Sequence, residues 1–444
     1  MSDSATRAGT RAREAGWRSG RGLGGAVGRG VLLAAVTAAV AIGQVWYGNR
    51  HGFFDLKIYR LAMRWWADGH PLYTFAKPDA TQGELGFTYP PFAAVLLRPL
   101  AWLSVGAAET IFVVVSGAAL AVSVYWLVRP VADRHGQPRW FAVGLAFVLA
   151  TALEPIRETI TFGQINLLLF ALVLADLLWL APRGSRLTGI GIGIATAIKL
   201  VPGVFILYLL ACRRWRAAAV ATGTAAAATL LAAAVAPRDS WEFWTRQLRH
   251  ADGIGNLDYF SNQSLLGLLA RLAPSGQPPG ALWLAVALPI LGYGLWRAAR
   301  SAGVIGTARS GSGGTGDEVA GLTLAGLAGS LASPVTWHHH LVWFVPALVV
   351  LVDAALGTPR RFEPLALRPD SPAVRPTGRQ PAWLWALAGL TYATVTFSVI
   401  SLAEFTLDHP GGVVGFVLIN WFVLLSLVLL FTLPARTAGK VTGG

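Results

Sequence analysis

The chain alternates between long apolar runs and short polar connections. Many of the runs are roughly 17–25 residues long, the length of a helix that crosses a bilayer, and a few are shorter. This pattern predicts an all-α integral membrane protein with about twelve transmembrane helices. The candidate spans are residues 28–47, 107–128, 140–153, 163–181, 187–199, 202–212, 215–235, 280–297, 318–333, 340–356, 381–403 and 411–433.

One apolar stretch is interrupted by prolines. The segment TYPPFAAVLLRPLAWLS, residues 88–104, contains Pro90, Pro91 and Pro99. Irregular backbone is tolerated near a membrane only where protein covers it or where it lines a wet cavity. We therefore expect a juxtamembrane or re-entrant helix in the first outer loop, and we do not count this stretch as a span.

The two ends of the chain differ from the apolar part. Residues 1–27 are rich in Arg and Gly, which predicts a disordered cytoplasmic segment. The first apolar run has no convincing small-residue cleavage site, so we expect it to remain as the first span. Residues 28–434 would then form a single membrane domain, followed by a cytoplasmic tail at 435–444.

Composition and charge give the orientation. The chain is 54% hydrophobic and 13% charged, and its net charge is +14. The positive charge lies in the short connections between spans, which is the pattern of the positive-inside rule and excludes a nucleic-acid partner. We expect the protein to lie in the plasma membrane, and the rule places both of its termini in the cytoplasm. The same rule favours dividing residues 187–212 into two spans. A single cysteine, Cys212, excludes an intrachain disulfide.

Polar residues gather on the outer side of this topology. Ionisable groups at membrane depth are costly, so they usually face a cavity or a partner. We therefore expect one shared, outward-facing cavity. The segments that contribute to it are 48–106, 154–162, 199–201, 236–279, 333–339 and 404–410.

The first outer loop contains a candidate general base. In FFDLKIYRLAMRWWADG, Asp55, Tyr59 and Met63 fall on one face of a helix. Asp55 would either cap that helix through its carboxylate or act as a base that accepts a proton from a substrate. Lys57 and Arg64 would either anchor the helix at lipid headgroups or bind a phosphate.

Other outer segments supply amides and a carboxylate. In EPIRETITFGQINLLL, Glu158 precedes Gln164 and Asn166, which open a span. Buried amides usually bond to other helices, but at an outer mouth they also suit a hydroxyl-rich ligand. Asn262 and Gln263 stand just before an apolar helix, where a polar residue could also cap it.

A lysine and three histidines complete the candidate set. Lys199 interrupts an apolar run in TAIKLVPGV, where it could reach the membrane surface or offer a point charge to a phosphate. His338–His340 are adjacent in SPVTWHHHLVW. Adjacent helical residues diverge by about 100°, so they do not share one metal ion, and we expect hydrogen bonds to a ligand or to Asp55 instead.

Taken in order, these motifs resemble those of the GT-C membrane glycosyltransferases. The stretches GQINLLLFALVLADLL, GIATAIKLVPGVFILYLL, NQSLLGLLARL and SPVTWHHHLVW are similar to the actinobacterial family of polyprenol-phosphate-mannose-dependent α-1,2-mannosyltransferases. The resemblance runs from about residue 45 to 350. It implies a GT-C fold, Asp55 as the catalytic base, and a histidine pair at His339 and His340, with His338 as the variable position.

The resemblance also implies the partners. These are a polyprenyl-phosphate sugar donor, a glycolipid acceptor such as a phosphatidylinositol mannoside or lipomannan, and the membrane lipids around a monomer. Around the donor we expect Lys57, Arg64, Lys199, His339 and His340. Around the acceptor we expect Tyr59, Glu158, Gln164, Asn166, Asn262 and Gln263.

The chemistry of such a donor needs few groups. Its leaving group departs as an anionic phosphate, which calls for cations or hydrogen-bond donors rather than an acid, while the acceptor hydroxyl needs one base. Attack opposite the phosphate inverts the anomeric centre. We expect neither a metal nor another cofactor. The alternatives are an arabinofuranosyltransferase with a similar donor, and a lipid or sugar transporter; a purely structural role fits the clustered polar residues poorly.

Overall fold

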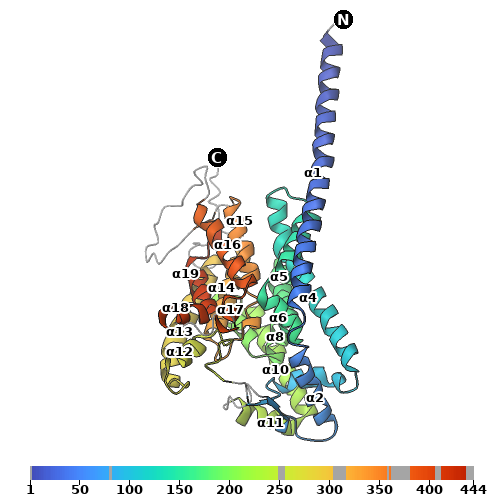
Figure 1. The fold of residues 1–444 in the computed structure, drawn as a ribbon. Coiled ribbons are helices and arrows are strands. Elements are labelled where there is room, and N and C mark those ends of the chain that lie inside the picture. Colours follow the sequence, from blue (N-terminus) through green and yellow to red (C-terminus); the bar gives the residue numbers. More distant parts are fainter. Residues whose placement is uncertain are drawn as a thin grey trace.

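The structure is a computed structural model in which helices form nearly all of the regular elements. It describes residues 3–79, 83–248, 256–303, 317–357, 360–361, 381–405 and 412–436. The sheets in this part of the chain are two short antiparallel pairs, β1 (Ala76–Asp79) with β2 (Gly83–Gly86) and β3 (Arg360–Arg361) with β4 (Ala435–Arg436). The expected all-α membrane architecture is confirmed (Figure 1).

Five helices are long and apolar enough to cross a membrane. They are the Gly25–Tyr47 part of α1 (Asp3–Tyr47), α4 (Val105–Arg134), the helix formed by α7 (Asn166–Leu174), η3 (Ala175–Leu180) and η4 (Ala181–Arg183), α10 (Trp215–Val235) and α13 (Gly280–Ser301). Three bent pairs would raise the number to eight: α5 (Arg139–Ala152) with α6 (Glu154–Phe162), α16 (Ala382–Thr396) with α17 (Val399–Phe405), and α18 (Gly412–Ile419) with α19 (Trp421–Thr432). The predicted count of about twelve is therefore not confirmed.

The difference arises from four predicted spans that form short helices. These are α8 (Ile190–Ile198), α9 (Val204–Ala211, preceded by η5, Val201–Gly203), α14 (Glu318–Ala332) and α15 (Phe344–Ala355). None reaches the roughly 20 residues that a span needs. The expected division of residues 187–212 is present, because Lys199 between α8 and α9 has an extended backbone with φ −147° and ψ 129°.

The segment after the third predicted span, residues 140–153, differs from expectation. We predicted that residues 154–162 are an outer loop, whereas they form helix α6, bent by 68° from α5. Leu153 is extended, and Pro155 lies in the first turn of α6, where its missing N–H costs no hydrogen bond. Gly163, with φ +75°, then ends α6 before α7 begins.

The N-terminal helix is longer than its apolar part. α1 already begins at Asp3, so it continues through most of the segment 1–27 for which we predicted disorder. Ala and Arg, which are frequent there, have high helix propensity. Gln44 near the other end of α1 donates a hydrogen bond to the carbonyl of Thr151 in α5, 2.7 Å away.

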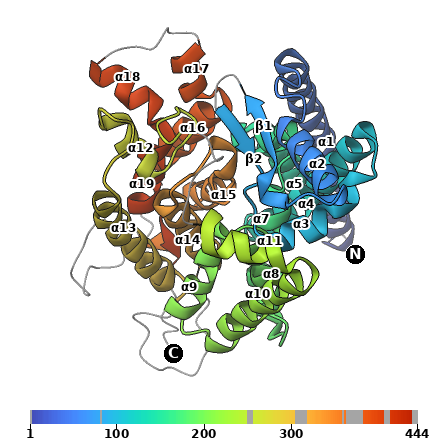
Figure 2. The same cartoon turned by 90° about the horizontal axis from the view of Figure 1, so that it is seen from below.

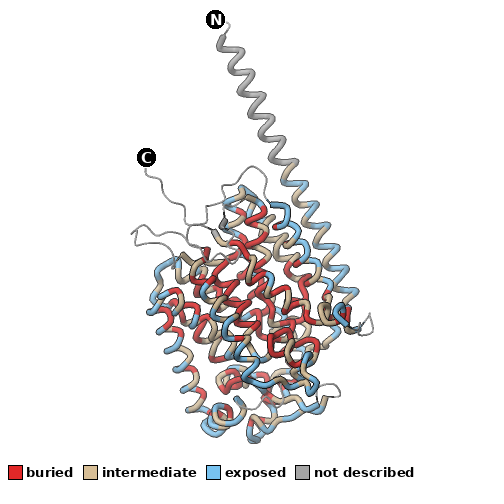
Figure 3. Tube along the Cα trace, turned by 90° about the vertical axis from the view of Figure 1, so that its left-hand side faces the viewer, coloured by how far each residue is buried: buried red, intermediate tan, exposed pale blue. Residues whose placement is uncertain are grey.

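Helix α14 lies at the centre of the core. Every residue from Ala320 to Leu331 is buried. Glycines permit this, because a Cβ at Gly326 would lie 2.2 Å from the Trp343 ring and one at Gly294 of α13 would lie 2.4 Å from the Cβ of Ala328. Small residues let apolar helices approach closely. In Figure 3 the buried segments run through the middle of the molecule, and α1 is exposed along its side.

One end of the molecule is covered by short elements from the loops that we predicted to be outer. These are α2 (Phe54–Ala67), η1 (Leu72–Thr74), β1, β2, α3 (Pro91–Leu97), η2 (Arg98–Ala101), α11 (Pro237–Glu242), η6 (Phe243–Gln247) and α12 (Leu265–Leu272). Several of them face the viewer in Figure 2. Asp239 connects α11 to α2 and η1. Its carboxylate accepts hydrogen bonds from the Trp66 indole at 3.0 Å and from the Leu72 amide at 2.8 Å.

The expected helices of the first outer loop are thus present. Helix α2 buries the face that carries Tyr59 and Met63, as predicted. The proline-interrupted stretch 88–104 forms α3 and η2 and is too short to cross a membrane.

Candidate active site

Asp55 lies in the first turn of α2, facing the body of the protein. The residue that precedes α2, Phe53, has a left-handed backbone with φ 56°, and no side chain caps the helix. The Asp55 carboxylate instead accepts a hydrogen bond from Nε2 of Gln164, 2.6 Å away. Asp55 therefore does not cap α2, and its carboxylate is held by Gln164 instead.

A glycine makes this contact possible. Gly163, next to Gln164, lies against α2, and a Cβ at this position would stand 2.5 Å from the Cβ of Leu56. Because Leu56 follows Asp55 directly, any side chain at Gly163 would separate the carboxylate from the amide. The left-handed backbone of Gly163 also disfavours other residues.

Two tyrosines fix the orientation of the Gln164 amide. Tyr89 donates a hydrogen bond of 2.7 Å to Oε1 of Gln164, so that Nε2 points to Asp55. The Tyr59 hydroxyl lies 2.9 Å from that of Tyr89, and both rings are buried. The carboxylate thus faces a neutral, ordered network.

This environment changes the basicity of Asp55. Burial raises the pKa of its carboxyl to about 6, although the Gln164 hydrogen bond acts in the opposite direction. A general base works best when its pKa is near the operating pH. Asp55 is therefore ionised at neutral pH and is a stronger base than an ordinary aspartate.

Lys199 lies beside this network, at the break between α8 and α9. Its Nζ is 3.1 Å from Oδ1 of Asn166, 2.9 Å from Nε2 of His340 and 3.5 Å from the Tyr89 hydroxyl. The predicted residues Lys199, Asn166 and His340 therefore meet, and Tyr89 connects them to Gln164 and Asp55.

The hydrogen bonds of His340 define the proton position on its ring. The backbone N–H of Trp337 donates to Nδ1 of His340 at 3.2 Å, so a neutral ring carries its proton on Nε2. That nitrogen faces Lys199. The contact is then a hydrogen bond from the imidazole to an uncharged amine, which in turn donates to Asn166.

A small cavity adjoins this lysine. Its volume is about 50 Å³, and its polar lining residues are Lys199, Asn166, His340 and Ser330. The remaining wall is mostly apolar and includes Phe205 and Trp343. The arrangement places a polar, potentially cationic group beside an apolar surface.

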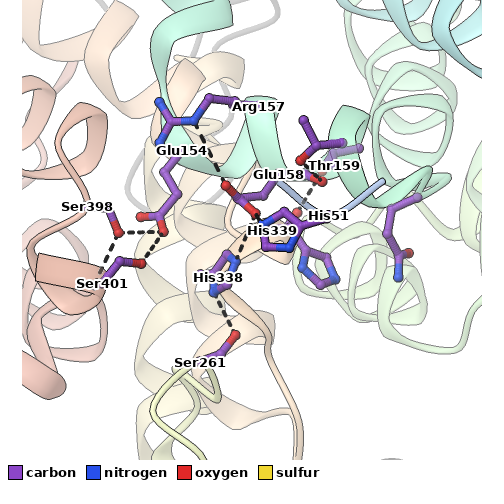
Figure 4. Close-up of polar contacts among 12 residues, drawn as sticks. His51, Glu154, Arg157, Glu158, Thr159, Ser261, His338, His339, Ser398 and Ser401 are labelled. Atoms are coloured by element: carbon purple, nitrogen blue, oxygen red, sulfur yellow. Dashed lines mark hydrogen bonds and ion pairs between the residues drawn. The ribbon is translucent and has the colours of Figure 1, made fainter. Parts of the chain in front are cut away.

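A second polar cluster surrounds Glu158 of α6 (Figure 4). Its carboxylate contacts the Tyr47 hydroxyl and the His51 ring, both near the end of α1. Nε2 of His338 in η7 (His338–His340) lies 3.7 Å away, and Nδ1 of the same ring is 2.6 Å from the Ser261 hydroxyl. Basic side chains thus surround Glu158 and favour its ionised form.

The two clusters are joined by the carbonyl of His339. Thr159 donates to this oxygen at 3.0 Å and Asn166 at 3.1 Å. The His339 ring is buried, and neither of its nitrogens has a hydrogen-bond partner. Of the two predicted histidines, only His340 contacts Lys199, while His339 leaves two ring nitrogens for a ligand or a water.

Two predicted cations lie outside this network. Lys57 is on the exposed face of α2, with Nζ 3.8 Å from a carboxylate oxygen of Glu109. Arg64 is also exposed and donates to the carbonyl of Ala101 at 3.1 Å. Both brace α2 against its neighbours.

Two predicted amides bond chiefly to the main chain. Asn262 accepts from the amide of Thr336 at 3.0 Å, and its Nδ2 donates to main-chain carbonyls. Gln263 donates to the carbonyl of Ile419 at 2.8 Å and accepts from the amide of Phe422 at 3.1 Å. Both side chains are fully buried and hold the loop before α12 in place.

Sequence reasoning did not assign several residues that the structure places in the clusters. Tyr89 and His51 are the most important, because each contacts a predicted carboxylate or its direct partner. Tyr89 precedes two prolines in a loop and His51 follows the first span, so their position at the membrane edge was the available signal. Within the described residues, no group of three His, Cys, Asp or Glu side chains is arranged to hold a metal ion.

Comparison with known proteins gives a family. Residues 87–311 match the profile of glycosyltransferase family 87. A Mycobacterium tuberculosis (strain H37Rv) protein is 35% identical over 425 residues, which cover 88% of this chain and 94% of that protein. It is named polyprenol-phosphate-mannose-dependent alpha-(1-2)-phosphatidylinositol mannoside mannosyltransferase.

Two other similarities are weaker. An alpha-(1->3)-arabinofuranosyltransferase of Mycobacterium tuberculosis (strain CDC 1551) is 30% identical over 220 residues, 45% of this chain and 48% of that one. The crystal structure of ArnT from Cupriavidus metallidurans bound to undecaprenyl phosphate aligns with 90% of this chain and 76% of its own, with a TM-score of 0.33 and 18% identity.

Proposed function

This chain belongs to glycosyltransferase family 87, and on that premise we propose that it transfers mannose from polyprenyl-phosphate-mannose to a mannose hydroxyl of a phosphatidylinositol mannoside or lipomannan-type glycolipid. The observation that carries this proposal is the pairing of one basic carboxylate, Asp55, with the half-buried Lys199 through Gln164 and Tyr89. The names of the similar proteins support the donor and the α-1,2 linkage.

Asp55 would act as the general base. An acceptor hydroxyl has a pKa far above neutrality, so its oxygen attacks well only as its proton is removed. Asp55 would take that proton, with Gln164 holding the carboxylate in place and Tyr89 orienting the Gln164 amide. A single carboxylate is sufficient, unlike in glycosidases, which use two.

Lys199 and His340 would receive the departing phosphate. The bond that breaks joins the anomeric carbon to a phosphate oxygen, and the electron pair leaves with the phosphate. An arriving phosphate anion would favour the ammonium form of Lys199, which must then release the His340 hydrogen bond. Both side chains would face the developing charge as donors, and preorganised donors of this kind are worth several kcal/mol in a transition state.

The stereochemistry follows from this arrangement. Attack from the face opposite the phosphate inverts the anomeric centre, so a β-linked donor gives an α-linked product. The step needs no metal, since the lysine and the histidine supply the positive charge and the hydrogen bonds. The apolar wall beside Lys199 would accommodate the first part of the polyprenyl chain.

We also propose that the site faces the periplasm. The opposite ends of the helices carry arginine-rich turns, with Arg183 and Arg186 after η3, Arg213 and Arg214 before α10, and Arg216 in its first turn. Cytoplasmic connections are enriched in Lys and Arg. The protein would then lie in the plasma membrane with both termini in the cytoplasm, acting as a monomer.

One experiment separates this function from its alternatives. The purified full chain is reconstituted in liposomes with a phosphatidylinositol mannoside, and radiolabelled mannose or arabinofuranose is supplied on polyprenyl phosphate. We expect mannose label in a new glycolipid and little arabinose transfer. Preferential arabinose transfer would favour an arabinofuranosyltransferase, and label that enters the liposome without a glycolipid product would favour a transporter.

A further inference from the structure

A second, larger cavity lies at the far end of the helices that form the active site. It has a volume of about 740 Å³, within the usual range of ligand sites. The helix Asn166–Arg183 runs from one site to the other, and its 18 residues correspond to about 27 Å. Helices α9, α14 and α15 also have one end near each cavity. The two sites therefore lie toward opposite ends of this helix.

The cavity is positively charged. Four arginines line it, against two acidic residues, Glu318 and Asp353. Both acids are already paired, Glu318 with the Arg214 guanidinium and Asp353 with Nη2 of Arg134 at 2.8 Å. His135 also contacts Asp353 at 3.0 Å. The two remaining arginines, Arg213 and Arg216, leave an excess of positive charge.

Arg213 is the most informative of these residues. It follows the end of α9 with a left-handed backbone of φ 54°, a position that glycine usually occupies in a helix terminus. Its side chain makes no hydrogen bond or ion pair within the described residues. Arg213 is exposed to solvent at the rim of the cavity, so its guanidinium can bind an anion there, while its strained backbone would be relieved by glycine.

The rest of the wall is mostly apolar. Leu177, Val350 and Trp126 line the cavity, and Trp215 at its edge is largely exposed. Tryptophan is enriched at the boundary between lipid and water. An occupant with an anionic head and an apolar body fits these surroundings, whereas a small inorganic ion would leave most of the wall without contacts.

We propose that this cavity binds the phosphate headgroup of an anionic membrane phospholipid, with Arg213 and Arg216 as its ligands. The site is separate from the transfer chemistry, and its existence does not depend on the proposed function. Basic pockets between transmembrane helices are suited to such headgroups. A bound lipid would link α9, α10 and the turn at Ser185, to whose carbonyl Arg216 donates at 3.0 Å.

The test measures lipid binding to the full chain in detergent by native mass spectrometry. The probes are phosphatidylinositol, phosphatidylcholine and inorganic phosphate. The main variant is Arg213→Gly, because glycine suits the left-handed backbone and should preserve folding. Arg216→Ala is the second variant. Arg186→Gly is the matched control, since Arg186 is exposed at the same end of the molecule but outside the cavity.

We expect phosphatidylinositol to bind more tightly than phosphatidylcholine, and Arg213→Gly to weaken it about tenfold or more while the control binds normally. Equal binding to wild type and both cavity variants would overturn the proposal. So would equal affinity for phosphatidylcholine. Inorganic phosphate that displaces phosphatidylinositol stoichiometrically would overturn the lipid assignment in favour of a free anion.

Discussion

Replacing Asp55 by Asn should stabilise the protein, and the gain should depend on pH. The carboxyl has a pKa of about 6 in the folded protein against 3.8 for the ordinary group. The unfolded chain therefore loses its proton first as the pH rises, and the free energy of unfolding falls between pH 3.8 and 6. Above pH 6 the folded protein carries the full cost of a buried carboxylate.

The size of this effect follows from the pKa shift. Two pKa units correspond to about 3 kcal/mol. Asp55 is half-buried, so solvent screening reduces the expected value to roughly 1–3 kcal/mol. Asparagine can still accept the hydrogen bond from Gln164, which keeps the network intact. A gain of this size should raise the melting temperature by about 2 °C or more.

The assay compares thermal unfolding of wild type and Asp55→Asn in detergent at pH 4 and pH 8. We expect a higher melting temperature for the variant at pH 8 and nearly equal values at pH 4. Asp68→Asn is the matched control, because Asp68 lies exposed just after α2, and it should show no such dependence. A variant that is less stable at both pH values would refute the reasoning and favour a capping role for Asp55.

Three further substitutions test the neighbours of Asp55. Lys199→Met should lower kcat about 10²–10³-fold in a steady-state assay, because it removes the donor nearest the leaving phosphate. An unchanged kcat would contradict the role of Lys199 as a phosphate ligand. Gln164→Glu places a second carboxylate beside Asp55, so the acid limb of the pH–rate profile should move to higher pH; an unmoved limb would argue against Asp55 as the titrating base. Gly163→Ala should overlap Leu56 and lower both the melting temperature and activity; wild-type values for both would show that the close contact is unimportant.

The positions of the helices could be read from the sequence more reliably than their lengths. The break at Lys199 was predictable, because a charged residue interrupts an apolar run and Pro202 follows it. The burial of α14 was not, because it depends on close contacts of Gly326 and Gly329 with the side chains of Trp343 and Val204. Apolar runs predict short helices and long membrane spans equally well, which explains why the predicted number exceeds the five to eight long apolar helices.

The individual residues of the candidate site could be predicted from the sequence, but the contacts between them could not. Asp55, Gln164 and Lys199 were selected because polar groups at membrane depth are costly and usually face a cavity or a partner. Their connection through Tyr89 depends on the tertiary fold, which brings residues 75 and 110 positions apart into contact. For Lys57, position in the first loop suggested a phosphate ligand or a headgroup anchor, but it did not reveal the neighbouring Glu109.

The most direct test of the central claim is mannose transfer by wild type, Asp55→Asn and Asp68→Asn, purified and folded to the same extent. The measured quantity is the rate at which label from polyprenyl-phosphate-mannose appears in a phosphatidylinositol mannoside at pH 7.5. Our account predicts transfer by wild type and Asp68→Asn, and a rate at least about 10²-fold lower for Asp55→Asn. A near-wild-type rate for Asp55→Asn would contradict it.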